Sequence, residues 1–104
     1  MSKNALDKYQ DFAKKSADPA CSLDSLFIGL SAEVGELHSE RMRELRTDRE
    51  AFGHHEVLSE LGDIMWYVAN IAGRYGMTLQ EVSKYNQEKL IERGNNNGCT
   101  IKSK

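Results

Sequence analysis

The 104 residues suit a single domain with one modest core, and the composition, 39% hydrophobic and 29% charged, is ordinary for a globular protein. A formal net charge of −2 argues against a general nucleic-acid binder, because such proteins carry a basic surface. The apolar runs are too short to span a bilayer and the first residues lack a signal-peptide core, so we expect a cytoplasmic protein without membrane contact.

The first half of the chain has the periodicity of two helices. One is expected over residues 4–15, and a loop containing Asp18 and Pro19 follows it. The next is capped by Ser22 or Asp24 and runs to about residue 46. The inward-facing positions are expected to be Leu6, Tyr9, Phe12 and Ala13 in the first helix and Leu23, Leu26, Phe27, Leu30, Val34 and Leu37 in the second.

The second half predicts two more helices and therefore an all-α chain. The third helix is expected over residues 54–75, where Gly76 is well placed to end it. Thr78 and Glu81 have the spacing of a capping box, which opens a fourth helix that ends near Gly94. The inward-facing positions of the third helix are expected to be Val57, Leu58, Leu61, Ile64, Met65, Val68 and Ile71.

The composition changes after the fourth helix. Residues 1–94 are expected to form one helical domain, and residues 95–104 a flexible polar tail. Cys21 and Cys99 lie far apart and form no C-x-x-C pair. Free thiols in a reducing cytoplasm are therefore favoured over a disulfide, which stays an alternative.

Two acidic pairs are the most informative feature of the sequence. Glu33-Val34-Gly35-Glu36 and Glu60-Leu61-Gly62-Asp63 each place two carboxylates at positions i and i+3 of a predicted helix. Residues at that spacing share one helix face, so two antiparallel helices can direct all four carboxylates to one point. An oxygen-only donor set suits Mg²⁺, Mn²⁺ or Ca²⁺, and the chain has neither the Glu-x-x-His motifs of a di-iron bundle nor a zinc pattern.

The glycine inside each acidic motif needs an explanation, because glycine within a helix costs roughly 1 kcal/mol relative to alanine. We expect Gly35 and Gly62 to allow a close approach of the two helices, which would also bring the acidic pairs together. The alternative is a pair of tolerated glycines beside solvated acids. Further along the second helix, the role of Glu40 has three alternatives: it binds a metal, it positions a water molecule, or it pairs with nearby arginines. Glu44 is expected to make a surface ion pair.

These residues together resemble a known family. The Glu33-x-x-Glu36 and Glu60-x-x-Asp63 pairs resemble the E-x-x-E…E-x-x-D signature of the MazG-like nucleoside triphosphate pyrophosphohydrolases, which are all-α proteins. The segment Asn86-Gln87-Glu88-Lys89-Leu90-Ile91-Glu92-Arg93 is similar to the family's N-x-x-K-L-x-x-R pattern. The resemblance covers about residues 5–94, nearly the whole chain.

The resemblance implies a four-helix MazG-like bundle that is completed by oligomerisation, as a homodimer or homotetramer. It implies Mg²⁺-dependent cleavage of a nucleoside triphosphate between its α and β phosphates, with Mn²⁺ as a substitute metal. The implied catalytic and metal-binding residues are Glu33, Glu36, Glu60 and Asp63, and the implied substrate-binding residues are Asn86, Lys89 and Arg93. Many members carry another glutamate directly before the first motif glutamate, where this chain has Ala32, and this bears on the number of metals.

The sequence gives weaker indications of which residues contact the nucleobase. Trp66 and Tyr67 follow Asp63 by about one helical turn, so both are expected near the metal face, and Tyr67 is the candidate that we assign to the substrate. Tyr9 and Phe12 on the first helix are further candidates for stacking on the base. A core role is the more common one for an aromatic residue at helical spacing. Apolar residues such as Phe27 and Ile28 exceed what a short chain can bury, which independently favours a second copy.

Two other kinds of protein remain open on the sequence alone. A noncatalytic helical module would use the acidic face to bind a metal or a basic partner without turning over a nucleotide. A structural or regulatory protein would use the acidic pairs only for salt bridges with its arginines. The response of turnover to Glu60→Gln separates an enzyme from both.

Overall fold

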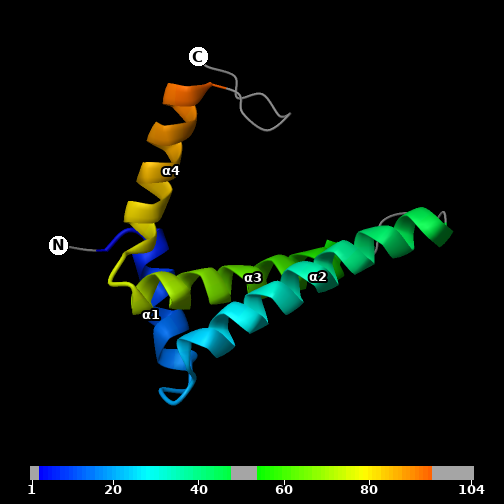
Figure 1. The fold of residues 1–104 in the computed structure, drawn as a ribbon, viewed down its shortest axis with the longest axis horizontal. Coiled ribbons are helices and arrows are strands. Elements are labelled where there is room, and N and C mark those ends of the chain that lie inside the picture. The colour runs from blue at the N-terminus through cyan, green and yellow to red at the C-terminus, as the bar shows by residue number, and fades with distance from the viewer. Residues whose placement is uncertain (1–2, 48–53, 95–104) are drawn as a thin grey trace.

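The computed structural model describes residues 3–47 and 54–94. These residues form four helices, namely α1 (Ala5–Ser16), α2 (Leu23–Thr47), α3 (His54–Arg74) and α4 (Leu79–Arg93), as Figure 1 shows. The all-α prediction and the four predicted helices are therefore confirmed. The predicted tail and Cys99 lie outside the described residues, whereas Cys21 is a free thiol. No helix in the described ranges is long and apolar enough to cross a membrane.

Side-chain caps explain where three of the helices begin. Asn4 caps α1, because its Oδ1 accepts a hydrogen bond from the Asp7 backbone N–H at 2.9 Å. Ser22, rather than Asp24, caps α2 by accepting from the Ser25 N–H at 3.0 Å. The capping box predicted for α4 is confirmed, since the side chains of Thr78 and Glu81 accept from each other's backbone N–H groups at 3.0 and 2.8 Å.

Glycine in the left-handed region ends α3 and α4. Gly76 has a φ of 74°, and the chain closes there through a Met77 N–H to Ala72 C=O hydrogen bond of 2.9 Å. Gly94 has a φ of 72° and donates its N–H to the Leu90 carbonyl at 2.9 Å. Both predicted stops are confirmed. Glycine suits these positions because a residue with a Cβ is strained at such φ values.

The four helices of one chain form an open arrangement. α2 and α3 lie side by side as a long antiparallel hairpin, α1 crosses one end of α3, and α4 extends away from the hairpin (Figure 1). α3 contacts each of the other three helices, whereas α2 contacts α3 alone. Among the residues that the structure describes, one side of the hairpin is therefore left uncovered.

The small core lies where α1, α3 and α4 meet. Its buried members are Ala13, Ala69, Ala72 and Leu79, with Leu6, Tyr9 and Trp66 packed against them. The buried Gln10 lies beside this core, and its amide donates to the Ala69 and Met77 carbonyls at 3.1 and 3.0 Å and accepts from the Leu79 N–H at 3.2 Å. Gln10 therefore ties α1 to the end of α3 and to the start of α4.

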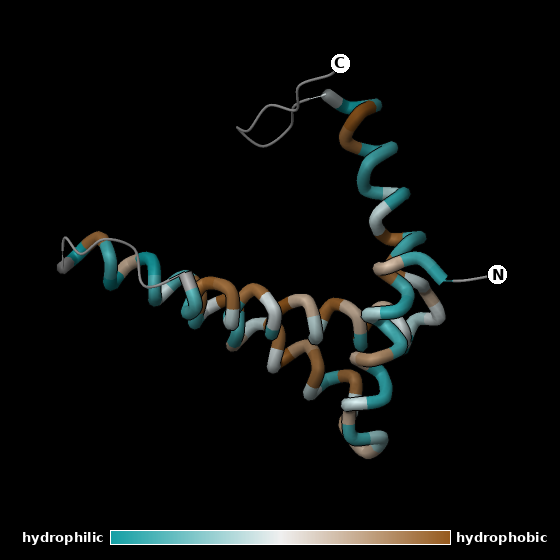
Figure 2. The backbone as a smooth tube through the Cα atoms, turned by 180° about the vertical axis from the view of Figure 1, so that it is seen from behind, coloured by the Kyte–Doolittle hydropathy of each residue, from teal (hydrophilic) through white to brown (hydrophobic). Residues whose placement is uncertain are grey.

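Several residues that we predicted to face inward are exposed. Leu26 is fully buried as predicted, but Phe27 and Val34 in α2 remain 44% and 49% exposed. The other expected core residues that are exposed are Phe12, Leu58, Leu61, Met65 and Val68. Figure 2 shows hydrophobic positions recurring along both helices of the hairpin. The prediction fails for these residues because an amphipathic pattern marks a face that needs cover, and of the described helices only α3 covers α2.

The close helix approach expected at Gly35 and Gly62 is also wrong within one chain. A Cβ built on either glycine would meet nothing within 4 Å. The reason lies in the helix geometry, because each glycine is two residues from the glutamate that begins its motif, about 200° around the helix. When Glu33 and Glu60 face the space between the helices, Gly35 and Gly62 must point elsewhere.

Candidate metal centre

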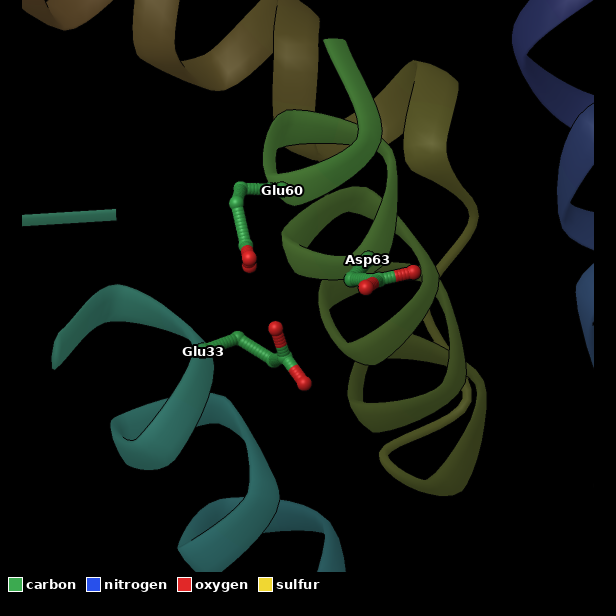
Figure 3. A group of neighbouring side chains, drawn as sticks. All are labelled: Glu33, Glu60 and Asp63. Atoms are coloured by element: carbon green, nitrogen blue, oxygen red, sulfur yellow. The ribbon is translucent and has the colours of Figure 1, made fainter. Parts of the chain in front are cut away.

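The hairpin brings carboxylates of both acidic motifs together. Glu33 from α2 and Glu60 and Asp63 from α3 each offer one carboxylate oxygen, and these oxygens lie within 4.8 Å of one another. Figure 3 shows Glu33 extending toward α3 and Glu60 extending toward Glu33. The i, i+3 spacing places Glu60 and Asp63 on one face of α3, and the antiparallel packing of α2 places Glu33 opposite them.

A second carboxylate group adjoins the first. Glu36, Glu40 and Glu60 also bring their oxygens within 4.8 Å of one another, so Glu60 belongs to both groups. The structure therefore brings together the four acids predicted from sequence and adds Glu40, whose role the sequence left open. Glu44 is mostly buried and pairs with Arg41 at 2.9 Å, so it makes the predicted ion pair in a less exposed position than expected.

We call Glu33, Glu36, Glu40, Glu60 and Asp63 the acidic cluster. The pKa of Glu60 shows how these acids affect one another. A hydrogen bond with the Glu33 carboxyl raises the pKa of Glu60, and burial and the negative charges of Glu33, Glu36 and Asp63 raise this pKa further. Each of these effects disfavours the ionised form of Glu60. The cluster therefore stores like-charge repulsion that a bound cation would relieve.

Two oxygen atoms in the acidic cluster are buried without a hydrogen-bond partner. These are Oε1 of Glu40 and Oε1 of Glu60, although Arg43 Nη1 lies 3.6 Å from the former. Arg43 is thus an ion-pair partner of Glu40, whereas Glu60 Oε1 is left without a hydrogen bond, which is costly for a buried polar atom. A hard divalent cation is a natural partner for carboxylate oxygens from two helices. The residues present thus fit Mg²⁺ or Mn²⁺ in donor type and in arrangement.

Aromatic side chains adjoin one end of the cluster. Burial, followed by the negative charge of Asp63, raises the pKa of Tyr9, so α1 brings Tyr9 into the field of the acidic cluster. The rings of Trp66 and Tyr67 meet edge to face, with centroids 5.0 Å apart. Trp66 donates its indole N–H to Ser16 at 2.7 Å, so it has the structural role of joining α3 to α1.

The predicted substrate residues of α4 lie elsewhere in the single chain. Asn86 and Lys89 line a hollow of about 590 Å³, together with Tyr85, Met77 and other residues around the start of α4. No residue of the acidic cluster lines this hollow, and α4, which also carries Arg93, extends away from the hairpin (Figure 1). Tyr85 also lines this hollow, and we did not predict this from the sequence, although Tyr85 directly precedes Asn86. Lys89 Nζ lies 5.8 Å from the centroid of the Tyr85 ring.

Comparison with known proteins agrees with this geometry. The MazG nucleotide pyrophosphohydrolase domain family matches residues 22–97, which include all the acids of the cluster and the Asn86–Arg93 segment. The chain therefore belongs to the MazG nucleotide pyrophosphohydrolase domain family, and the resemblance seen in the sequence is confirmed.

Two relatives are similar over most of the chain. Gene 37 protein of Mycobacterium phage L5 is 31% identical over 75 residues, which cover 68% of this chain and 65% of that protein. The uncharacterized protein YvdC of Bacillus subtilis (strain 168) is 36% identical over 72 residues, which cover 62% of this chain and 68% of that protein. The chain thus spans about two thirds of the length of these relatives. No solved structure matches the chain.

Proposed function

We propose that the protein is a Mg²⁺-dependent nucleoside triphosphate pyrophosphohydrolase, which cleaves a ribo- or deoxyribonucleoside triphosphate between its α and β phosphates and releases a monophosphate and pyrophosphate. The observation that carries this proposal is the pair of carboxylate groups that share Glu60 between α2 and α3. Membership of the MazG family supplies the reaction class. We further propose that residues 1–94 act as one domain, because α1 packs on α3 and α4 through Gln10.

In this proposal the acidic cluster holds the metal. Glu33, Glu60 and Asp63 would bind one Mg²⁺. Glu36 and Glu40 would add carboxylates in the second group, which shares Glu60 with the first. A bound Mg²⁺ ion neutralises phosphate charge and lowers the pKa of a coordinated water. Glu40 supplies an additional carboxylate in a chain that has Ala32 where many relatives in the family carry a further glutamate.

The remaining substrate contacts are proposed for Tyr67 and for α4. Tyr67 would contact the nucleoside, whereas Asn86, Lys89 and Arg93 would contact the phosphates. Because α4 of one chain extends away from the acidic cluster, we propose that α4 of a second copy contributes the phosphate contacts in a homodimer or homotetramer. The uncovered apolar side of the hairpin supports this assembly.

The oligomer proposal predicts a solution mass of at least twice that of one 11.8 kDa chain. Light scattering coupled to size-exclusion chromatography at micromolar concentration measures this mass directly. The exposed Phe27, Ile28 and Leu61 side chains give the physical reason, since burying apolar surface drives association. A monomeric mass under these conditions would contradict the proposal.

The proposed reaction is tested by measuring pyrophosphate release from a panel of ribo- and deoxyribonucleoside triphosphates, with Mg²⁺ and with a chelator. Metal-dependent release of pyrophosphate with an equal amount of monophosphate is the expected result. Release of inorganic phosphate instead would place the cleavage at another bond. If folded protein binds Mg²⁺ but releases nothing across the panel, the noncatalytic metal-binding module becomes the favoured function.

Lys89→Ala is expected to raise the KM for the nucleotide with a smaller effect on kcat. A hydrogen bond from a charged group is worth about 1.5–3 kcal/mol, so the loss of a lysine–phosphate contact corresponds to a KM increase of about tenfold or more. Steady-state pyrophosphate release measures both constants. The matched control is Lys84→Ala, which removes an exposed lysine of α4 that does not line the hollow. An unchanged KM in the Lys89 variant would remove this residue from the phosphate contact.

A further inference from the structure

Gly29 in α2 occupies a tight position against Tyr67 in α3. A Cβ built on Gly29 would collide with the Tyr67 ring, at Cε1, Cζ and Oη. Of the other helical glycines that the structure describes, Gly35 and Gly62 face open space and Gly73 would make only ordinary contacts with Lys14, the closest at 3.4 Å. The phenol ring therefore occupies the volume that any side chain at position 29 would need.

This contact lies directly beside the acidic cluster. Gly29 precedes Glu33 by one helical turn in α2, and Tyr67 follows Asp63 by one turn in α3. Because α2 and α3 are antiparallel, both steps lead toward the same end of the hairpin, by about 5–6 Å along each helix axis. The Tyr67 ring therefore forms the layer next to the Glu33–Asp63 layer.

The ring is held from two sides. The α2 backbone at Gly29 lies against the phenol end, and Trp66 meets the ring edge to face at 5.0 Å between centroids. Trp66 is itself fixed by its hydrogen bond to Ser16 in α1. Tyr67 is therefore a half-buried aromatic ring with a defined orientation beside the acidic cluster, and an aromatic ring is a surface on which any nucleobase can stack.

We propose that Gly29 is a positioning residue for the substrate. Because Gly29 has no side chain, the Tyr67 ring can lie against α2, where it contacts the nucleoside while the phosphates bind at the acidic cluster. This inference rests on the proposed function and adds to it a residue outside the family's acidic motifs. A methyl group at position 29 would force the Tyr67 ring out of the position that it occupies in the structure. Substrate binding is then impaired, whereas the carboxylates one turn away keep their arrangement.

The test is Gly29→Ala, with Gly73→Ala as the matched control in a helix where a Cβ has room. Because stacking on an aromatic residue contributes to nucleotide binding, we expect the KM for the nucleotide to rise about tenfold while kcat and the Mg²⁺ requirement change little. Trp66 is the only tryptophan of the chain, so near-ultraviolet circular dichroism and tryptophan emission report whether its neighbour Tyr67 has moved. Both signals are expected to change in Gly29→Ala and to stay constant in Gly73→Ala.

A double-mutant cycle distinguishes positioning from a general packing defect. In a Tyr67→Ala background there is no ring to displace, so adding Gly29→Ala is expected to leave the KM where Tyr67→Ala alone sets it. A KM increase that persists in this background would overturn the inference, as would an unchanged KM and an unchanged tryptophan signal in folded Gly29→Ala. If Gly29→Ala does not fold, Tyr67→Leu removes the ring without adding atoms at position 29, and an unchanged KM in that variant would also overturn the inference.

Failure of the proposed function gives a different result. In that case the wild-type protein releases no pyrophosphate from any nucleotide, whichever residue is at position 29. The inference is then tested by calorimetric titration of the wild-type and Gly29→Ala proteins with Mg²⁺ and a nucleoside triphosphate that cannot be cleaved between its α and β phosphates. Weaker binding by the variant alone supports the role of Gly29, and equal affinities, or no binding by either protein, overturn it.

Discussion

Glu60→Gln is expected to lower turnover by about a hundredfold or more, since replacing even an outer-shell partner of a metal ligand costs about 10–100-fold. Glu60 is the residue that belongs to both carboxylate groups, so its replacement weakens the donor set on both sides. Glutamine keeps the size of the side chain but offers one neutral oxygen in place of a charged carboxylate. The steady-state rate of pyrophosphate release at saturating Mg²⁺ measures this effect.

The same variant is expected to be at least as stable as the wild type when metal is absent. The carboxyl group of Glu60 has a raised pKa because Glu33 and the other acids disfavour its charged form, and glutamine removes that charge. In the wild type, Mg²⁺ is expected to raise the melting temperature, because a ligand that binds only the folded state stabilises it. Glu60→Gln should lose most of this metal-dependent increase.

Asp24→Asn is the control for the charge change, because Asp24 is an exposed acid in the first turn of α2, outside the acidic cluster. We expect this variant to keep both its turnover and its response to Mg²⁺. A kcat near the wild-type value in Glu60→Gln would refute the metal role of Glu60 and would favour the interpretation that the acidic pairs serve only in salt bridges.

Of the substitutions proposed for this protein, Gln10→Ala is expected to destabilise the fold most. It should lower the free energy of unfolding by about 3 kcal/mol or more. The truncation removes three hydrogen bonds to the backbone, at the Ala69 and Met77 carbonyls and the Leu79 N–H. Each buried group that is left without a partner costs about 1–3 kcal/mol. Urea denaturation followed by circular dichroism, at one fixed protein concentration, measures the loss.

Gln10→Ala should also loosen α4, since Gln10 links α1 to the Met77 carbonyl and to the Leu79 N–H at the start of α4. The control is Gln87→Ala, which truncates an exposed glutamine of α4 and is expected to change the unfolding free energy by less than about 0.5 kcal/mol. Equal stabilities of the two variants would show that the hydrogen bonds of Gln10 are replaced by water at little cost.

The sequence predicted the helices well because the signals that define them are local. The Thr78–Glu81 capping box and the Gly76 and Gly94 stops depend on residues within one or two turns of each other, and all three are confirmed. The spacing of Glu33 and Glu36 and of Glu60 and Asp63 is equally local, so the sequence alone indicated a carboxylate cluster. Membership of the MazG family was indicated by the same residues.

Gln10 and Gly29 show what the sequence did not reveal. Glutamine is usually exposed, so Gln10 was not expected in the core, although it lies on the same face of α1 as Leu6 and Ala13. Gly29 has no local feature that distinguishes it from Gly35, which faces open space. In both cases the role depends on a residue of α3 or α4 that is distant in sequence.

By itself, the sequence indicated an all-α chain, the approximate ends of its four helices, and four of the acids in the candidate metal centre, because these properties follow from helical periodicity and capping. Only the tertiary structure decided that Glu40 joins the cluster, that Tyr67 lies on Gly29, and that α4 extends away from the hairpin. These features depend on how α2 and α3 align and on what packs against them. Such contacts join distant segments, and a local sequence pattern can identify a face that needs cover without identifying what covers it.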